Sequence, residues 1–127
     1  MASYRVEELI RRYVVAYNAF DIDGMCLLLT DDVQFANHAG GNITVQTTGL
    51  DAFRRLAEQS KGVFSEREQR ITNVKLHDDG ATVGILFNGR LGVDFPDGPA
   101  AGTILTVTGT SDFSFVAGKI ARIIDRS

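Results

Sequence analysis

The sequence is short of several features that would point to particular classes of protein. Its single cysteine, Cys26, cannot form an internal disulfide, and one free thiol is typical of a reducing compartment. The two histidines, His38 and His77, lack the spacing of metal ligands. No apolar run approaches the roughly 20 residues of a membrane span, and the chain begins with a charged amphipathic stretch rather than a secretory signal. We therefore expect a cytoplasmic protein with no metal or other cofactor and no membrane contact.

Neither sign of charge predominates in the sequence. The chain has 13 Lys and Arg against 16 Asp and Glu, a net charge of −3, and its basic residues are scattered. Such a surface does not follow a phosphate backbone, so we expect no nucleic-acid partner. The 127 residues, 44% of them hydrophobic, are enough for one core and too few for two. We expect a single domain over residues 1–127.

The first half of the chain has mainly helical spacing. Apolar residues recur at steps of three and four from Val6 to Phe20, which predicts a helix from about Ser3 to Phe20. A short second helix is predicted within residues 21–29, followed by one short strand. A third helix should begin after Gly49 and stop at Gly62.

From Glu66 onward the period changes to two. Every second residue from Val83 to Phe95 is nonpolar, which indicates a long, half-buried antiparallel strand. Turn residues at 77–80, 96–99 and 116–119 separate it from its neighbours. The predicted fold class is α+β: a cone-shaped domain with a strongly curved antiparallel sheet covered by three N-terminal helices. A curved sheet roofed by helices leaves an apolar hollow, where a ligand can bind.

Three segments spread along the chain resemble a known superfamily. They read RRYVVAYNAFDIDGMCLLLTDDVQF, TTGLDAFRRL and FVAGKIARIIDRS. They resemble the ketosteroid isomerase-like and SnoaL-like families of the nuclear transport factor 2-like superfamily. The resemblance implies the cone-shaped fold, but the superfamily includes isomerases, cyclases, dehydratases, epoxide hydrolases and non-catalytic binders, so it leaves the function open.

The catalytic residues of ketosteroid isomerases can be compared position by position. The family tyrosine falls on Tyr13, the base aspartate on Asn37, and the aspartate that donates a hydrogen bond on Ser111. An amide does not take up a proton near neutral pH. The resemblance therefore does not extend to steroid isomerisation.

Limonene-type epoxide hydrolases offer a second comparison. Their first-strand Asn matches Asn37 and their last-strand Asp matches Asp125, but Phe35 stands where they have a Tyr. Their Arg-x-Asp has no counterpart, since the nearest residues are Asn88 and Arg90, on the polar side of their strand. Two matches do not imply a hydrolase.

Strand parity tests the surviving candidates independently of the resemblance. If the apolar faces of the strands point inward, Asn37, Ser111 and Asp125 lie on the side of the hollow, as does Tyr13 from the first helix. We predict Asp125, Tyr13 and Asn37 as catalytic residues. The predicted ligand-binding residues are Phe35, Phe53, Phe87, Ser111, Phe113 and Ile123.

Each candidate also has a plain structural interpretation. Tyr13 can be a core residue with a hydrogen-bonded hydroxyl, and Asn37 can shape the turn that follows it. Asp125 can be solvated or paired with Arg122 or Arg126. We expect a small-molecule pocket protein for an apolar or polyketide-like ligand, acting as an isomerase, cyclase or hydratase through a pocket carboxylate. The alternative is a non-catalytic dimeric binding or interaction module. A homodimer is expected in either case, because one flat, uncharged strand face would otherwise stay open; its row is Ile104, Thr106, Thr108 and Thr110.

Overall fold

The structure is a computed structural model that describes residues 3–127. Its helices are α1 (Ser3–Asn18), α2 (Ile22–Cys26) and α3 (Leu50–Lys61). Its strands are β1 (Leu29–Ala39), β2 (Asn42–Thr48), β3 (Phe64–His77), β4 (Gly80–Leu91), β5 (Ile104–Val116) and β6 (Lys119–Arg126). None of the helices in this range has the length and apolar character needed to cross a membrane.

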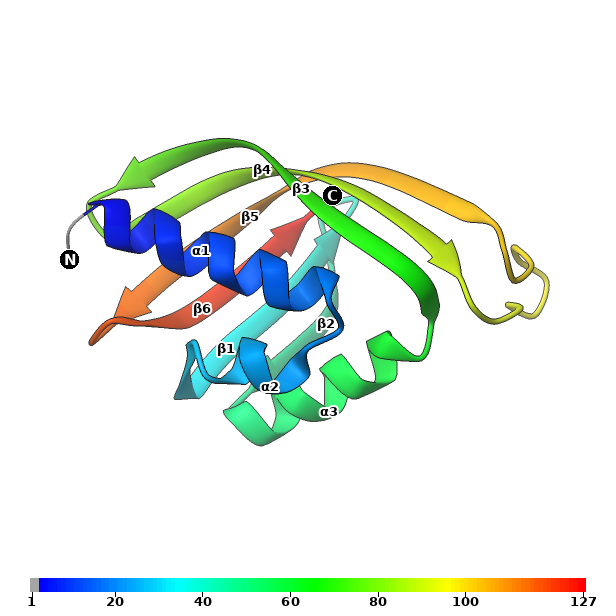
Figure 1. Cartoon of the computed structure of the whole chain (residues 1–127), viewed down its shortest axis with the longest axis horizontal. Coiled ribbons are helices and arrows are strands. Elements are labelled where there is room, and N and C mark those ends of the chain that lie inside the picture. Colours follow the sequence, from blue (N-terminus) through cyan, green and yellow to red (C-terminus); the bar gives the residue numbers. More distant parts are fainter. Residues whose placement is uncertain (1–2) are drawn as a thin grey trace.

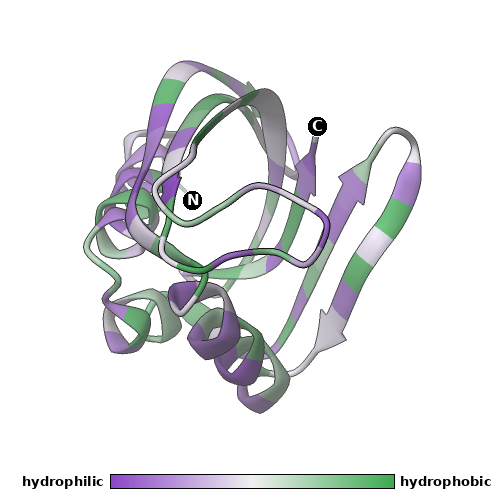
Figure 2. Ribbon diagram, turned by 90° about the vertical axis from the view of Figure 1, so that its right-hand side faces the viewer, coloured by the Kyte–Doolittle hydropathy of each residue, from purple (hydrophilic) through white to green (hydrophobic). Residues whose placement is uncertain are grey.

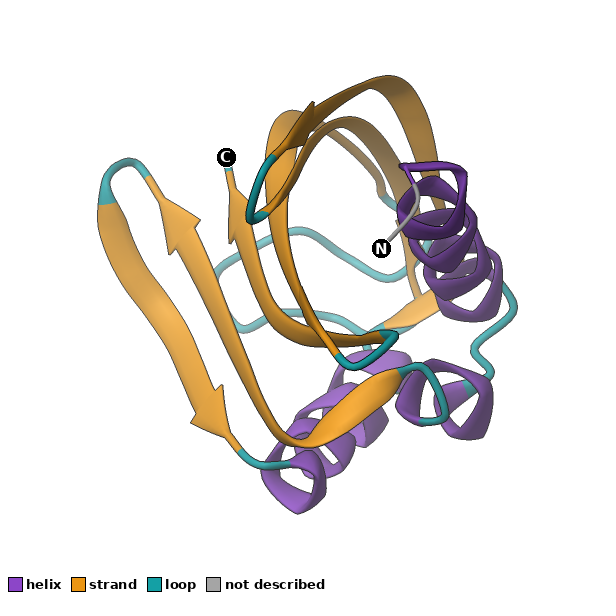
Figure 3. Ribbon diagram, turned by 90° about the vertical axis from the view of Figure 1, so that its left-hand side faces the viewer, coloured by secondary structure: helices purple, strands orange, loops and turns teal. Residues whose placement is uncertain are grey.

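The strands form one curved sheet with the helices along one side of it (Figures 1 and 3). The strand order is β2-β1-β6-β5-β4-β3, and hydrophobic and hydrophilic residues alternate along the strands (Figure 2). The predicted α+β fold with a curved sheet is confirmed. One correction concerns strand direction, because β1 and β6 are parallel while the other neighbours are antiparallel. Local alternation predicts which residues face inward, but it carries no information on the direction of a distant partner.

Two strand predictions differ from the structure in their extent. The single short strand expected before α3 is a hairpin of β1 and β2, turning through Gly40 and Gly41, both with positive φ. The strand expected to reach Phe95 ends at Leu91 instead. Gly92 N–H donates to Val63 O, just before β3, and Phe95 N–H donates to Pro99 O within the loop that follows. The chain therefore turns although the alternation of the sequence continues.

The C-terminal end of α1 closes with a bulky residue in a left-handed conformation. Phe20 has φ of 56°, and its N–H donates to Tyr17 O while Asp21 N–H donates to Ala16 O. This pair of bonds is a Schellman motif, in which glycine normally occupies the left-handed position. The helix therefore ends at Asn18, two residues before the predicted boundary.

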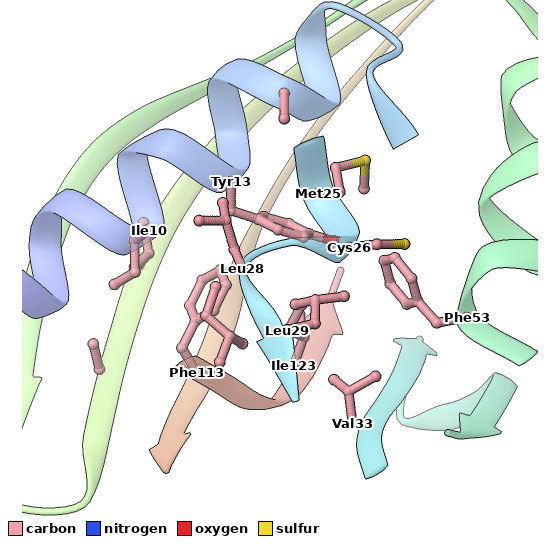
Figure 4. Packing of buried hydrophobic residues seen from close by; sticks show 14 of the residues in the cluster. Ile10, Tyr13, Met25, Cys26, Leu28, Leu29, Val33, Phe53, Phe113 and Ile123 are labelled. Carbon is pink, nitrogen blue, oxygen red and sulfur yellow. The ribbon is translucent and has the colours of Figure 1, made fainter. Parts of the chain in front are cut away.

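Buried side chains pack α1, α2 and α3 against the sheet (Figure 4). Ile10, Leu29 and Ile123 are at most 1% exposed, and each such side chain stabilises the fold by about 1.5–3 kcal/mol through burial. Tyr13 of α1 meets Phe113 of β5 edge to face, with ring centroids 6.0 Å apart. This packing fixes α1 over the sheet and with it the polar groups described next.

Cys26 lies in the same core and is 5% exposed. Burial raises the pKa of its thiol, which disfavours the reactive thiolate. The thiol therefore behaves as a small apolar side chain.

Candidate active site

Three polar residues lie side by side on neighbouring strands. Asn37 of β1 pairs with Asp125 of β6, and Asp125 pairs with Ser111 of β5. Directly paired residues in a sheet project from the same face. The register thus brings together three of the residues that the sequence singled out.

Asp125 is the one acid in this row of three residues. Its Oδ1 accepts a hydrogen bond from Ser111 Oγ at 2.6 Å, and Ser111 is 4% exposed. Removal from water raises the pKa of Asp125 from 3.8 to about 6, because burial disfavours the charged form, while the Ser111 hydrogen bond works in the opposite direction. Among residues 3–127 no ion pair neutralises it: Arg126, its neighbour in sequence, binds Asp112 instead, at 2.9 Å.

Two tyrosines of α1 face this carboxyl. Tyr13 is 5% exposed, and its pKa lies well above 10 because of burial and then of the charge of Asp125. Burial also raises the pKa of the half-buried Tyr17, against the opposing effect of Arg67. Both phenols therefore remain protonated at neutral pH and can donate hydrogen bonds.

Asn37 is held by its own hairpin. Its Nδ2 donates to Thr44 Oγ1 at 2.8 Å, and the same hydroxyl donates back to Asn37 O at 3.1 Å. The β1–β2 register shifts between Asn37 and His38, a bulge of the kind that re-aims a side chain. The amide is fixed in orientation and cannot act as a base.

The row opens into a hollow with two lobes that share Tyr17, Asn37, Gln69 and Asp125. The first lobe, about 240 Å³, lies under α3 and α1 and includes Tyr13, Phe35, Phe53 and Arg67 in its walls. The second lobe, about 200 Å³, includes Ile85, Phe87, Val107 and Ser111. Asp125 therefore stands at the junction of the two lobes.

The sequence-predicted residues divide between the walls and the core. Phe35 and Phe53 line the first lobe, and Phe87 and Ser111 line the second. Phe113 and Ile123, 3% and 1% exposed, pack in the core and line neither lobe.

Several wall residues were not singled out from the sequence, among them Tyr17, Arg67 and Gln69. Tyr17 lies on the same apolar stripe as Tyr13, and that position was the available signal. Gln69 and Arg67 lie in the polar run SEREQR, which is typical of a solvated strand and gives no sign that Arg67 is buried.

A larger depression of about 780 Å³ lies elsewhere, between the first half of α1 and the turn that joins β3 to β4. It does not include the row of Asn37, Asp125 and Ser111. In the part of the chain that the structure describes, no three His, Cys, Asp or Glu side chains come together in a way that could hold a metal ion.

The family model of the SnoaL-like domain matches residues 10–123. The chain belongs to the SnoaL-like domain family. The family lies in the nuclear transport factor 2-like superfamily, as the resemblance implied. No curated protein matches the sequence.

Solved structures share the SnoaL-like fold at low sequence identity. A candidate polyketide cyclase of Xanthomonas campestris pv. campestris is 22% identical with a TM-score of 0.83, covering 98% of this chain and 90% of its own. A candidate SnoaL-like polyketide cyclase of Jannaschia sp. CCS1 is 16% identical with a TM-score of 0.81, covering 96% and 84%. A protein of Catenulispora acidiphila with a ketosteroid isomerase-like fold, bound to trimethylamine, is 16% identical with a TM-score of 0.77, covering 93% of this chain and 83% of its own. At these identities the likeness establishes the fold, and the reaction must be argued from the site.

Proposed function

We propose that this SnoaL-like protein, as one domain over residues 1–127, binds a small, largely apolar molecule and moves a proton on it through Asp125. The observation that carries the proposal is the Asp125 carboxyl, which has no ion pair among the described residues, a pKa of about 6, and a place at the junction of both lobes. A carboxyl that titrates near the working pH can both accept and return a proton. Isomerisation, cyclisation and hydration each involve a proton transfer that such a group can perform.

The groups around Asp125 can each be given a role in the proposed proton transfer. The Asp125 carboxylate takes a proton from a carbon next to a ligand carbonyl or from a water molecule. The phenol of Tyr13 or Tyr17 donates a hydrogen bond to the oxygen on which negative charge develops. Asn37, fixed by Thr44, orients the ligand. Asp125 then returns the proton at a second position, which leaves the protein unchanged.

Steroid isomerisation is not part of the proposal. The position of the isomerase base holds Asn37, and the position of the donor acid holds Ser111, whose hydroxyl is already committed to Asp125. The candidate cyclases among the structural relatives favour a polyketide-like ligand, and the aromatic walls of the first lobe suit one.

The second candidate function is a non-catalytic dimeric binding module. The row Ile104, Thr106, Thr108 and Thr110 is exposed in the described chain, with Ile104 59% exposed. An uncharged, open row on a sheet face favours a homodimer, which we propose for either function. The lone buried thiol supports a cytoplasmic location.

The test is a carbon-13 NMR titration of the side-chain carboxyls, with the Asp125 signal assigned by its loss in Asp125→Asn. We expect a midpoint near pH 6. A midpoint near pH 4 would remove the proton-transfer role and leave the binding module. Native mass spectrometry of both forms as purified reports ligand retention, which we expect Asp125→Asn to preserve because it keeps the shape of the site.

A further inference from the structure

Arg67 of β3 is a buried cation in a wall of the first lobe. It is 7% exposed and lies where β3 passes the C-terminal end of α1. Among residues 3–127 no carboxylate forms an ion pair with it. Taking a charge out of water is costly, so a buried guanidinium needs compensating contacts.

The contacts that the protein supplies occupy only part of this guanidinium. Nε donates to Tyr17 O at 2.9 Å. The Cζ atom lies 3.7 Å from the ring centroid of Tyr17 and 4.3 Å from that of Phe20, which is within cation–π range. A side-chain hydrogen bond with Tyr17 also raises the pKa of Arg67, against the larger lowering by burial. Among residues 3–127 Arg67 has no hydrogen-bond partner other than Tyr17. An arginine offers five N–H donors; Tyr17 takes one with its carbonyl and one with its side chain, so about three are left for a ligand.

The main chain is strained next to Arg67, at Phe20. Phe20 adopts the left-handed conformation at the end of α1, where a bulky side chain costs about 1–3 kcal/mol relative to a relaxed one. Glycine would end the helix without that cost. The Phe20 ring, however, is one of the two rings that hold Arg67. The strain therefore coincides with the placement of the cation rather than with the needs of the helix.

The same lobe also presents aromatic surface. Phe35 and Phe53 meet edge to face with centroids 5.8 Å apart, and Phe64 lies on the wall with them. Asp125 stands in this lobe as well. One buried cation, one carboxyl and an aromatic surface thus face a space of about 240 Å³.

We propose that Arg67 is the anion-recognising group of the hollow, so that the ligand is an apolar ring compound carrying an ionised oxygen, as in a carboxylate or an ionised enol. The oxygen accepts hydrogen bonds from the terminal nitrogens of Arg67, which bind oxyanions with a fixed fork geometry. The ring body lies against Phe35 and Phe53, and this places the rest of the ligand toward Asp125. The inference rests on the proposed function and narrows its substrate class.

The test compares two probes of the same shape, one anionic and one neutral. The carboxylate 2-naphthoate and the neutral amide 2-naphthamide have the same ring system and similar size. Isothermal titration calorimetry with the full chain at pH 7.5 should show 2-naphthoate binding more tightly. Arg67→Met should weaken 2-naphthoate binding about tenfold to hundredfold, the range of a charged hydrogen bond, and leave 2-naphthamide within about twofold.

A purely structural role for Arg67 predicts a different pattern. If Arg67 only caps α1 through Tyr17 O, its loss would lower the melting temperature and weaken both probes equally. Arg67→Lys keeps the charge without the fork and should fall between the two forms. Arg70→Met is the matched control, since Arg70 lies on the same strand, is exposed, and pairs with Glu68 at 3.3 Å.

Several outcomes would overturn the inference. They are equal binding of the two probes by the unmodified protein, no binding of 2-naphthoate, or an equal loss in Arg70→Met and Arg67→Met. Asp125→Asn separates this inference from the proposed function, because it should abolish proton transfer and keep the preference for 2-naphthoate. An Asp125 midpoint near pH 4 together with an intact preference would leave Arg67 as the anion site of a binding protein.

Discussion

Replacing Asp125 by Asn should stabilise the protein at neutral pH, although it removes a group proposed to be active. The carboxyl sits beside Ser111 in a dehydrated place, where its charged form is disfavoured. Asparagine has the same shape, and its Oδ1 can accept the Ser111 hydrogen bond without carrying a charge. The substitution therefore removes the cost of burying an ionised group and little else.

The size of the effect follows from the pKa of Asp125, which rises from 3.8 to about 6 on folding. Each pKa unit corresponds to 1.36 kcal/mol, so ionised Asp125 costs the folded state about 3 kcal/mol above pH 6. The sign is that of a raised acid: the unfolded chain loses this proton first, near pH 4, and the folded chain holds it to about pH 6. Stability due to this group is greatest at low pH, falls between pH 4 and 6, and is constant above.

The assay is urea unfolding of the unmodified protein and Asp125→Asn at pH 4, 5, 6 and 8 and one protein concentration. The difference between their unfolding free energies should grow by about 2–3 kcal/mol from pH 4 to pH 8, in favour of Asn. Taking the difference cancels the titration of other groups, and Asp31→Asn, on an exposed part of β1, controls for the change in net charge. A difference that is flat with pH, or that favours Asp at pH 8, would refute the reasoning.

Three further predictions address the rest of the site and the surface. Ser111→Ala removes a hydrogen bond that lowers the pKa of Asp125, so the NMR midpoint should rise above about 6; a fall would mean that the bond stabilises the protonated form. A β,γ-unsaturated ketosteroid should show no turnover above buffer in an absorbance assay, because Asn37 cannot take up the proton, and ready turnover would contradict that assignment. Light scattering at micromolar concentration should give a dimer mass, and Thr108→Lys should give a monomer because it buries unpaired charges in the proposed interface; a monomer before mutation counts against the dimer.

Much of the fold could be predicted because local patterns decide it. Alternation of apolar residues predicted β4, and the turn at 77–80 separates it from β3 as expected. Parity likewise placed Asn37, Ser111 and Asp125 on one face, which the strand register bears out. These features depend on the period of side chains along an element, which is visible in the sequence.

Other features depend on contacts between residues that are far apart in the sequence. Phe113 and Ile123 have the parity of wall residues, but parity fixes the face and not the depth, and both are covered by core packing. Arg67 lies between two glutamates in the sequence, as a solvated residue would, and becomes buried only because Tyr17 and Phe20 close over it. No local sequence pattern predicts this contact between the end of α1 and β3.

The parallel pairing of β1 with β6 has a consequence for how the protein folds. Asn37 and Asp125 are neighbours in the sheet although about 90 residues separate them along the chain, and contacts of such long range are slow to form because chain entropy is lost before they contribute. Helix α1 and the meander from β3 to β5 can form from nearer contacts. We expect β6 to join β1 late, with refolding in the millisecond-to-second range that sheet-rich topologies show. Until that step β1 lies at a sheet edge. In such a partly folded chain the Asp125 carboxyl is not yet buried, and the ligand-binding hollow has not formed.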